Sequence, residues 1–215
     1  MALFQEGSIA VTTHMMKKSA RLLGIAAALA CASAHAATTV YTAALSGPAE
    51  SPPNASAGTG TATVTIDDVA NTMLVEVNFS GLTGTTTASH IHATTALGFT
   101  GTAGVATQLP TFSGFPLGVT SGTYSNLFDL LTAATYNPSF VTANGGTVAG
   151  AESALLSAIG SGRAYLNIHT TAFPSGEIRG FLVAVPEPAT WMMMLLGFAG
   201  MGLVIRFRRS SLARV

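Results

Sequence analysis

Cysteine and basic residues are both scarce in this chain. The single cysteine, Cys31, lies near the N-terminus, so residues 37–185 contain none. No disulfide can form within that segment, and its stability must come from a packed core. The same segment has seven acidic and two basic residues, a net charge of −5 with neutral histidines. A segment so poor in basic residues lacks the electrostatic footprint of a nucleic-acid binder, and we exclude nucleic acid as a partner.

Motifs of common enzyme classes are missing as well. The sequence has no P-loop, no dinucleotide-binding glycine fingerprint and no Gly-x-Ser-x-Gly turn. Thiol catalysis is excluded in residues 37–185 because no cysteine lies there. The adjacent carboxylates of Asp67 and Asp68 lie in a predicted turn, where solvation explains them. We therefore predict that the protein is not an enzyme.

Residues 1–36 have the pattern of a signal peptide preceded by a start placed too far upstream. Met15-Met16-Lys17-Lys18 opens a basic region, residues 22–32 are apolar, and Ala34-His35-Ala36 forms a small-x-small cleavage site. The apolar run is too short to cross a bilayer. We predict that signal peptidase recognises Ala34 and Ala36 and that the rest of the chain is exported. Lipoprotein processing at Cys31 is the alternative.

Residues 185–215 combine a Pro-Glu-Pro sequence, an apolar run and an arginine cluster. The Pro-Glu-Pro sequence is Pro186, Glu187 and Pro188, and the cluster includes Arg206, Arg208 and Arg209. Residues 189–205 are predicted to form a transmembrane helix of about 25 Å, at the short end of what spans a membrane. Arginines after this helix and none near its start place the C-terminus in the cytoplasm.

This order of features resembles the PEP-CTERM sorting signal of Gram-negative bacteria. The resemblance implies processing by an exosortase, which is a membrane transpeptidase, and an association with exopolysaccharide and biofilm. The alternative is an ordinary C-terminal anchor that stays attached, since an arginine cluster fits any stop-transfer segment.

Residues 37–184 are predicted to form one all-β domain. Their composition is rich in Thr, Gly, Ala, Ser and Val, which favours strands and turns over long helices. Alternation of apolar and polar residues predicts strands at 40–45, 61–66, 73–79, 163–170 and 177–183, another around His90, and two short ones within 94–123. Residues 127–135 and 151–159 are predicted short helices, the first ended by Asn137-Pro138. Many short strands with frequent turns are typical of an antiparallel β-sandwich of the Greek-key or immunoglobulin-like kind.

Three histidines of this domain form a candidate metal site. His90 and His92 are two residues apart on a predicted strand, so both imidazoles point to one face, as two ligands of one ion require. His169 lies on the polar side of another predicted strand. If the strands are neighbours, the three rings can bind zinc or copper, with Glu177 as an oxygen ligand or as an acceptor behind the histidines. The alternative is structural: the histidines bond to the backbone or to Glu177, and Glu177 pairs with Arg179.

The histidine motifs also carry a family resemblance. His90-Ile91-His92, residues 165–170 and the closing motif Pro174–Gly180 closely resemble the CHRD domain, first described in the vertebrate secreted protein chordin and widespread in bacterial exported proteins. Residues 41–53 resemble the start of that family, a strand leading into a loop with an acid and prolines. The residues that carry the closing motif are Asn167, Glu177, Arg179 and Gly180. The resemblance implies an extracellular β-sandwich with no established enzymatic activity.

These features together predict an exported protein with a non-catalytic binding or structural role. We expect it to be anchored in the inner membrane before sorting, and then to reach the cell surface or extracellular matrix. Exopolysaccharide or a surface protein is the expected partner there. The alternative function is a small secreted metalloprotein that uses His90, His92 and His169 either to hold zinc or copper or to carry out redox chemistry.

Overall fold

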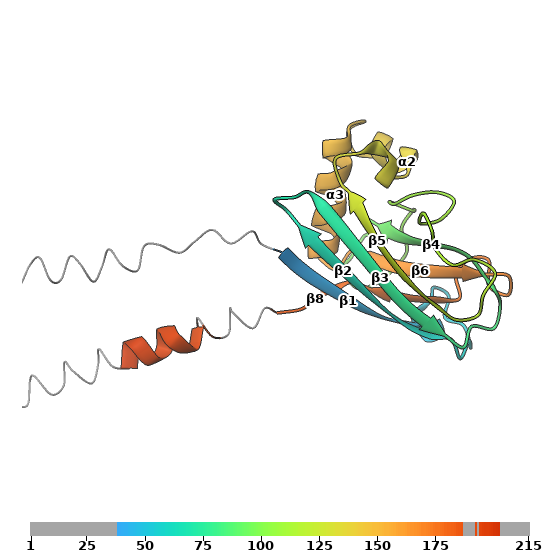
Figure 1. The fold of residues 1–215 in the computed structure, drawn as a ribbon, viewed down its shortest axis with the longest axis horizontal. Helices are drawn as coiled ribbons and strands as arrows, with labels where there is room; N and C mark the ends of the chain where they lie inside the picture. The colour runs from blue at the N-terminus through green and yellow to red at the C-terminus, as the bar shows by residue number, and fades with distance from the viewer. Residues whose placement is uncertain (1–37, 187–191, 193, 203–215) are drawn as a thin grey trace, which may run out of the picture. The chain divides into compact units, whose positions relative to one another are not determined.

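The computed structural model describes residues 38–186, 192 and 194–202 (Figure 1). The predicted signal peptide with Ala34 and Ala36, the sorting residues Glu187 and Pro188, and the arginine cluster lie outside the described residues. Residues 194–202 are helical and fall within the predicted transmembrane segment. Among the described residues, no helix has the length and apolar character needed to cross a membrane.

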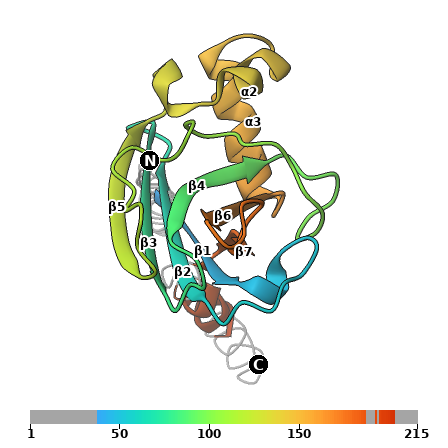
Figure 2. The ribbon, with the colours of Figure 1, turned by 90° about the vertical axis from the view of Figure 1, so that its right-hand side faces the viewer.

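The described domain is built on one antiparallel sheet of eight strands. The strands are β1 (Thr38–Ser46), β2 (Thr59–Asp67), β3 (Thr72–Ser80), β4 (Thr86–Ala93), β5 (Gly122–Asp129), β6 (Ala164–Thr170), β7 (Ile178–Phe181) and β8 (Val183–Ala184). Their order is β4-β6-β7-β1-β2-β3-β5, and β8 pairs with β1. Figure 2 shows that the sheet curls into a half-barrel.

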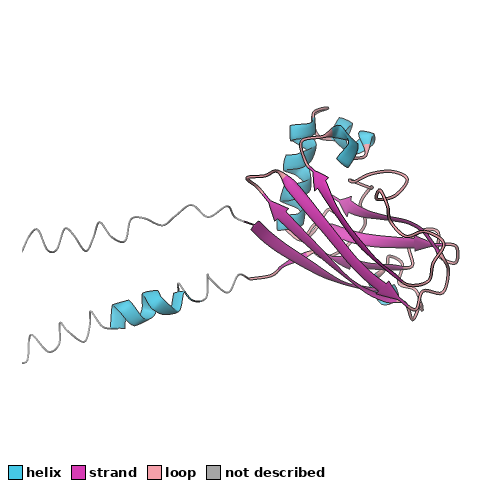
Figure 3. Cartoon of the chain, in the orientation of Figure 1, coloured by secondary structure: helices cyan, strands magenta, loops and turns pink. Residues whose placement is uncertain are grey.

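The all-β class is confirmed, but the predicted two-sheet sandwich is wrong. The apolar inner face of the sheet is covered by helix α3 (Val148–Gly160) and by loop side chains instead of a second sheet. Leu155 and Ile159 of α3 and Phe112 from a loop are fully buried in one cluster with Val75 and Leu166 of the strands. A second, short helix, α2 (Pro138–Ala143), contacts α3 beside the sheet (Figure 3). Because the sheet curls around α3 and these loop side chains, its inner face is buried without a second sheet.

Residues 94–121 run along the free edge of β4. The N–H groups of Ala93, Ala106 and Phe112 form backbone hydrogen bonds between this segment and β4, with N–O distances of 3.0–3.1 Å. The two short strands expected here do not form: only isolated bridges join His92 to Val105 and Thr107 to Tyr136. The segment therefore closes the sheet edge as an irregular loop, and it also supplies backbone carbonyls to the outer face of β4.

The local sequence patterns give a mixed outcome. The alternating runs at 61–66 and 73–79 do form the β2–β3 hairpin, and residues 151–159 lie within α3. The helix expected at 127–135 is wrong, because β5 extends to Asp129 and only a short 3-10 turn follows. Asn137-Pro138 begins α2 instead of ending a helix: the Asn137 side chain accepts a hydrogen bond from Ser139 N, and proline occupies the first turn. Proline is well tolerated there because its fixed φ suits a helix start.

Strands β4, β6 and β7 are buried on both faces, and this places the site. Ile91, Leu166 and Ile168 point into the core. The opposite face carries a polar layer, in which His90 lies opposite Asn167, His92 opposite Tyr165, and Asn167 opposite Arg179. Loops cover this second face, so its polar side chains are withdrawn from solvent.

Candidate metal centre

The three predicted histidines converge. His90 and His92 come from β4 and His169 from β6, which are adjacent antiparallel strands. One ring nitrogen of each lies within 4.8 Å of one from each other ring. His90 and His92 are 5 % and 9 % exposed, and His169 is partly exposed. The expectation that the two strands are neighbours is confirmed.

Each ring uses one nitrogen to bond a backbone carbonyl. The pairs are His90 Nε2 with Pro110 O at 2.6 Å, His92 Nδ1 with Ala103 O at 3.0 Å, and His169 Nδ1 with Pro174 O at 2.9 Å. A carbonyl only accepts, so each bonded nitrogen carries the proton. In a neutral ring the other nitrogen then holds a lone pair. Those other nitrogens are buried and have no hydrogen-bond partner among the described residues: His90 Nδ1, His92 Nε2 and His169 Nε2.

The environment keeps the three rings neutral. Burial lowers the pKa of His92 to about 4, against a smaller opposing effect of the Ala103 carbonyl. Burial also lowers the pKa of His90 and of His169, again partly opposed by their carbonyl partners. At neutral pH the lone pairs are therefore available without displacement of protons, which is what a metal ion requires of imidazole ligands.

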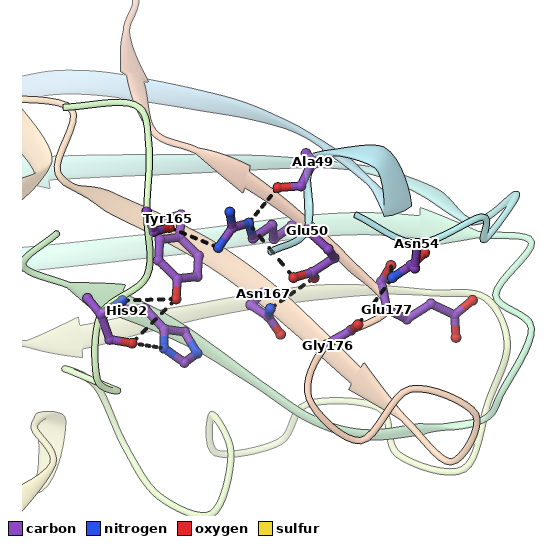
Figure 4. Close-up of polar contacts among 11 residues, drawn as sticks. Ala49, Glu50, Asn54, His92, Tyr165, Asn167, Gly176 and Glu177 are labelled. Atoms are coloured by element: carbon purple, nitrogen blue, oxygen red, sulfur yellow. Dashed lines mark hydrogen bonds and ion pairs between the residues drawn. The ribbon is translucent and has the colours of Figure 1, made fainter. Parts of the chain in front are cut away.

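A stack of side chains fixes the ring of His92. It lies parallel to the Tyr165 ring, with centroids 4.8 Å apart and an interplanar angle of 5°. On Tyr165 lies the guanidinium of Arg179, 4.7 Å from the ring centroid. The Tyr165 hydroxyl donates to Ala103 O, the carbonyl that also accepts from His92 (Figure 4). The orientation of His92 is thus set by both stacking and hydrogen bonding.

Glu177, predicted as a metal ligand or as an acceptor for the histidines, is not brought to them. Its carboxylate is fully buried and accepts hydrogen bonds from four groups: Ser56 Oγ at 2.5 Å, Thr83 N at 2.5 Å, Thr170 Oγ1 at 2.6 Å and Gly84 N at 3.2 Å. Figure 4 shows it directed away from His92. Glu177 therefore joins three chain segments instead of facing the candidate centre.

The predicted pairing of Glu177 with Arg179 is also wrong. Arg179 pairs with Glu50, with Nε and Oε2 3.8 Å apart, and donates to the carbonyls of Ala49 and Gly101. Glu177 precedes β7, so the alternation that would place it beside Arg179 does not apply. The fold also explains why the closing motif contains glycine at position 180. A Cβ at Gly180 would stand 2.9 Å from the carbonyl carbon of Ala44, so only glycine allows β7 to pack so closely on β1.

Comparison with known protein families shows which family the chain belongs to. The CHRD domain family matches residues 41–182, and the PEP-CTERM protein-sorting motif matches residues 184–209. This chain belongs to the CHRD domain family. Both resemblances seen in the sequence are confirmed, and together they indicate an extracellular protein of an exosortase-type sorting system. No curated protein and no solved structure matches the chain.

The CHRD domain contains one buried acid that the sequence patterns did not assign to the site. Glu50, 7 % exposed, accepts from Asn167 Nδ2 at 2.9 Å (Figure 4). Burial raises the pKa of Glu50 to about 7, although Arg179 and the Ser51 N–H act to lower it. An acid followed by prolines reads as a solvated loop, so only the fold reveals that this one is buried beside β6.

A Glu50→Gln variant of the CHRD domain tests this raised pKa. Folded Glu50 stays protonated up to about pH 7, whereas in the unfolded chain it ionises near 4.5. Unfolding therefore releases a proton between these values, and the parent loses stability as the pH rises from 4.5 to 7. We expect the stability of the variant relative to the parent to rise by up to about 3 kcal/mol across this window, measured by urea unfolding. The histidines are common to both proteins and cancel. A pH-independent difference would show an ordinary Glu50 pKa.

Proposed function

We propose that the CHRD domain of this exported protein binds one zinc or copper ion through His90, His92 and His169. The observation that carries the proposal is the convergence of the three rings: one ring nitrogen of each lies within 4.8 Å of one from each other ring. Each ring also has one buried nitrogen without a hydrogen-bond partner among the described residues. Behind each of them, the second ring nitrogen donates to a backbone carbonyl. That arrangement is typical of metal-ligating histidines, because it fixes the tautomer and the ring orientation.

Energetics favour an ion over a purely structural role. A buried polar atom without a partner costs about 1–3 kcal/mol. The bonds to the backbone account for one nitrogen of each ring, but they leave the other three unexplained. A bound ion would satisfy all three at once. At a zinc–nitrogen distance of about 2.1 Å, two tetrahedral ligands lie about 3.4 Å apart, so a pair of nitrogens at the outer bound of 4.8 Å must move closer together to bind one ion.

The donor set selects the class of metal. Imidazole suits zinc and copper, whereas calcium and magnesium prefer oxygen ligands. The carboxylate of Glu177 is engaged elsewhere, and residues 37–185 contain no cysteine. The neutral imidazoles of His90, His92 and His169 are therefore the groups that would hold the ion.

For the protein as a whole we propose a non-catalytic binding or structural role. The PEP-CTERM motif supports anchoring in the membrane before sorting, followed by delivery to the cell surface or extracellular matrix. Exopolysaccharide or another surface protein is the proposed partner there, with a link to biofilm. Protease accessibility of residues 38–186 in intact cells tests the destination, and a cytoplasmic location would overturn it.

Metal content of the purified protein tests the centre. We expect one zinc or copper ion per chain in the parent, and loss of at least nine tenths of it in a His90→Ala/His92→Ala variant, because a single imidazole binds a divalent ion weakly. A Thr61→Ala/Thr63→Ala variant changes two alternate positions of β2 and should keep the metal. Sub-stoichiometric metal in all three proteins, with melting unchanged by a chelator, would make the histidines structural.

A further inference from the structure

Asn167 lies on the same polar face as the three histidines. On β6 it precedes His169 by two residues, and in the sheet register it lies directly opposite His90. Its Oδ1 is buried and has no hydrogen-bond partner. Among the described residues, Oδ1 and the three imidazole nitrogens are the only buried side-chain polar atoms in that state. Because all four come from neighbouring positions of one face, they indicate a single ligand site and not scattered packing defects.

The orientation of the Asn167 amide is fixed by its hydrogen bond to Glu50. Nδ2 donates to Glu50 Oε1 at 2.9 Å, and this bond holds the amide with its nitrogen toward Glu50. Gly176, in the turn before β7, lies against this pair: a Cβ there would stand 2.8 Å from Glu50 Oε1. The Asn54 side chain holds the same turn by donating to the carbonyls of Gly176 and Glu177. A flip of the amide would break the bond from Nδ2 to Glu50.

We propose that Asn167 Oδ1 accepts a hydrogen bond from a water molecule that completes the coordination of the ion held by His90, His92 and His169. This inference rests on the proposed function. Zinc with three protein nitrogens takes a water as its fourth ligand, and that water needs an acceptor for its protons. Oδ1 is the one buried, unpartnered side-chain oxygen among the described residues. Asn167 is thus a positioning residue, and Glu50 acts through it by setting the amide.

The proposal also narrows the choice of metal ion. Three imidazoles and a water held by an amide oxygen form a nitrogen and oxygen set with no sulfur. Copper(I) favours thiolate and thioether ligands, whereas zinc and copper(II) accept imidazole and water. The centre is therefore expected to take zinc or copper(II) in preference to copper(I).

The test compares Asn167→Leu with Asn78→Leu in the purified full-length protein. Cobalt(II) serves as the spectroscopic probe and zinc as the competing ion. For Asn167→Leu we expect zinc affinity to fall by about 10–100-fold and the visible cobalt spectrum to change, because the water loses its acceptor. Asn78→Leu replaces an exposed asparagine on β3 that the site does not use, and it should keep the parent spectrum. Asn167→Asp places an anionic oxygen at the same position and should bind zinc more tightly than the parent.

The outcomes separate this inference from the proposed function. Parent-like affinity and spectrum in Asn167→Leu, with metal lost from His90→Ala/His92→Ala, would overturn the role of Asn167 and leave the three-histidine centre standing. Absence of metal from the parent would defeat the proposed function itself. If Asn167→Leu does not fold by circular dichroism, Asn167→Asp decides, because an affinity equal to that of the parent contradicts an oxygen that faces the bound water.

Discussion

Replacement of Glu177 by glutamine is expected to lower the free energy of unfolding of the CHRD domain by about 2–5 kcal/mol. The parent carboxylate accepts from Ser56 and Thr83 at one oxygen and from Gly84 and Thr170 at the other. A side-chain amide presents an NH2 group where one of these oxygens stood. One backbone N–H and one hydroxyl then face a donor in a fully buried position. The hydroxyl can rotate to accept from the amide, but the backbone N–H loses its acceptor without access to water.

The pH dependence of the parent gives a second readout of Glu177. Burial acts to raise its pKa, but the hydrogen bonds from Ser56, Thr170, Thr83 and Gly84 outweigh burial and lower it. A carboxyl whose folded pKa lies below its unfolded value stabilises the fold above the unfolded pKa, near 4.5, and loses that contribution as the pH falls through the folded pKa. The Glu177→Gln variant should lack this acid-dependent loss.

Urea unfolding at neutral pH and at acidic pH measures both effects. Glu76→Gln is the matched control, because Glu76 is an exposed acid on β3, and it should change stability by less than about 0.5 kcal/mol. If Glu177→Gln were as stable as Glu76→Gln, the four hydrogen bonds would not act as a structural junction. The sequence motif would then need another explanation for its glutamate.

Local patterns in the sequence predicted what local physics determines. Alternation identified the β2–β3 hairpin and the strand that carries His169, because a half-buried or fully buried strand constrains every second residue. His-x-His spacing placed two imidazoles on one face for the same reason. Alternation states that a face is buried, but not what buries it. The sandwich was therefore predicted where a curled sheet, one helix and loops fill the same space.

The parts of the site that sequence reasoning missed all depend on contacts between distant segments. Glu50 and Arg179 meet across the junction of a loop and β7, and no spacing rule links them. The carbonyls of Ala103 and Pro110 come from an irregular loop and belong to residue types with no polar side chain. Every residue has a backbone carbonyl, so the sequence does not show which carbonyl accepts a hydrogen bond from a side chain. Asn167 was recognised in the sequence as part of the closing motif, but it was not assigned to the metal site. Its unpartnered oxygen is visible only in the fold.

Removal of the metal is expected to lower the melting temperature of the loaded protein by roughly 10 °C. An ion that binds only the folded state stabilises it by about 4 kcal/mol at a free concentration 1,000-fold above Kd. In a domain of this size, each kcal/mol shifts Tm by about 2–4 °C. Thermal melting of the zinc-loaded protein with and without EDTA measures the shift, and His90→Ala/His92→Ala should show none.

The pH range of this stabilisation follows from the lowered pKa values of the three histidines. An imidazole with the ordinary pKa of 6.5 must lose a proton to bind metal below that pH, whereas His92 is neutral down to about pH 4. We therefore expect the metal-dependent rise in Tm to change little between pH 8 and pH 6. A shift that disappears steadily below pH 6.5 would indicate ordinary, exposed histidines. A shift equally large in the double variant would place the ion elsewhere on the chain, because that variant lacks two of the three proposed ligands.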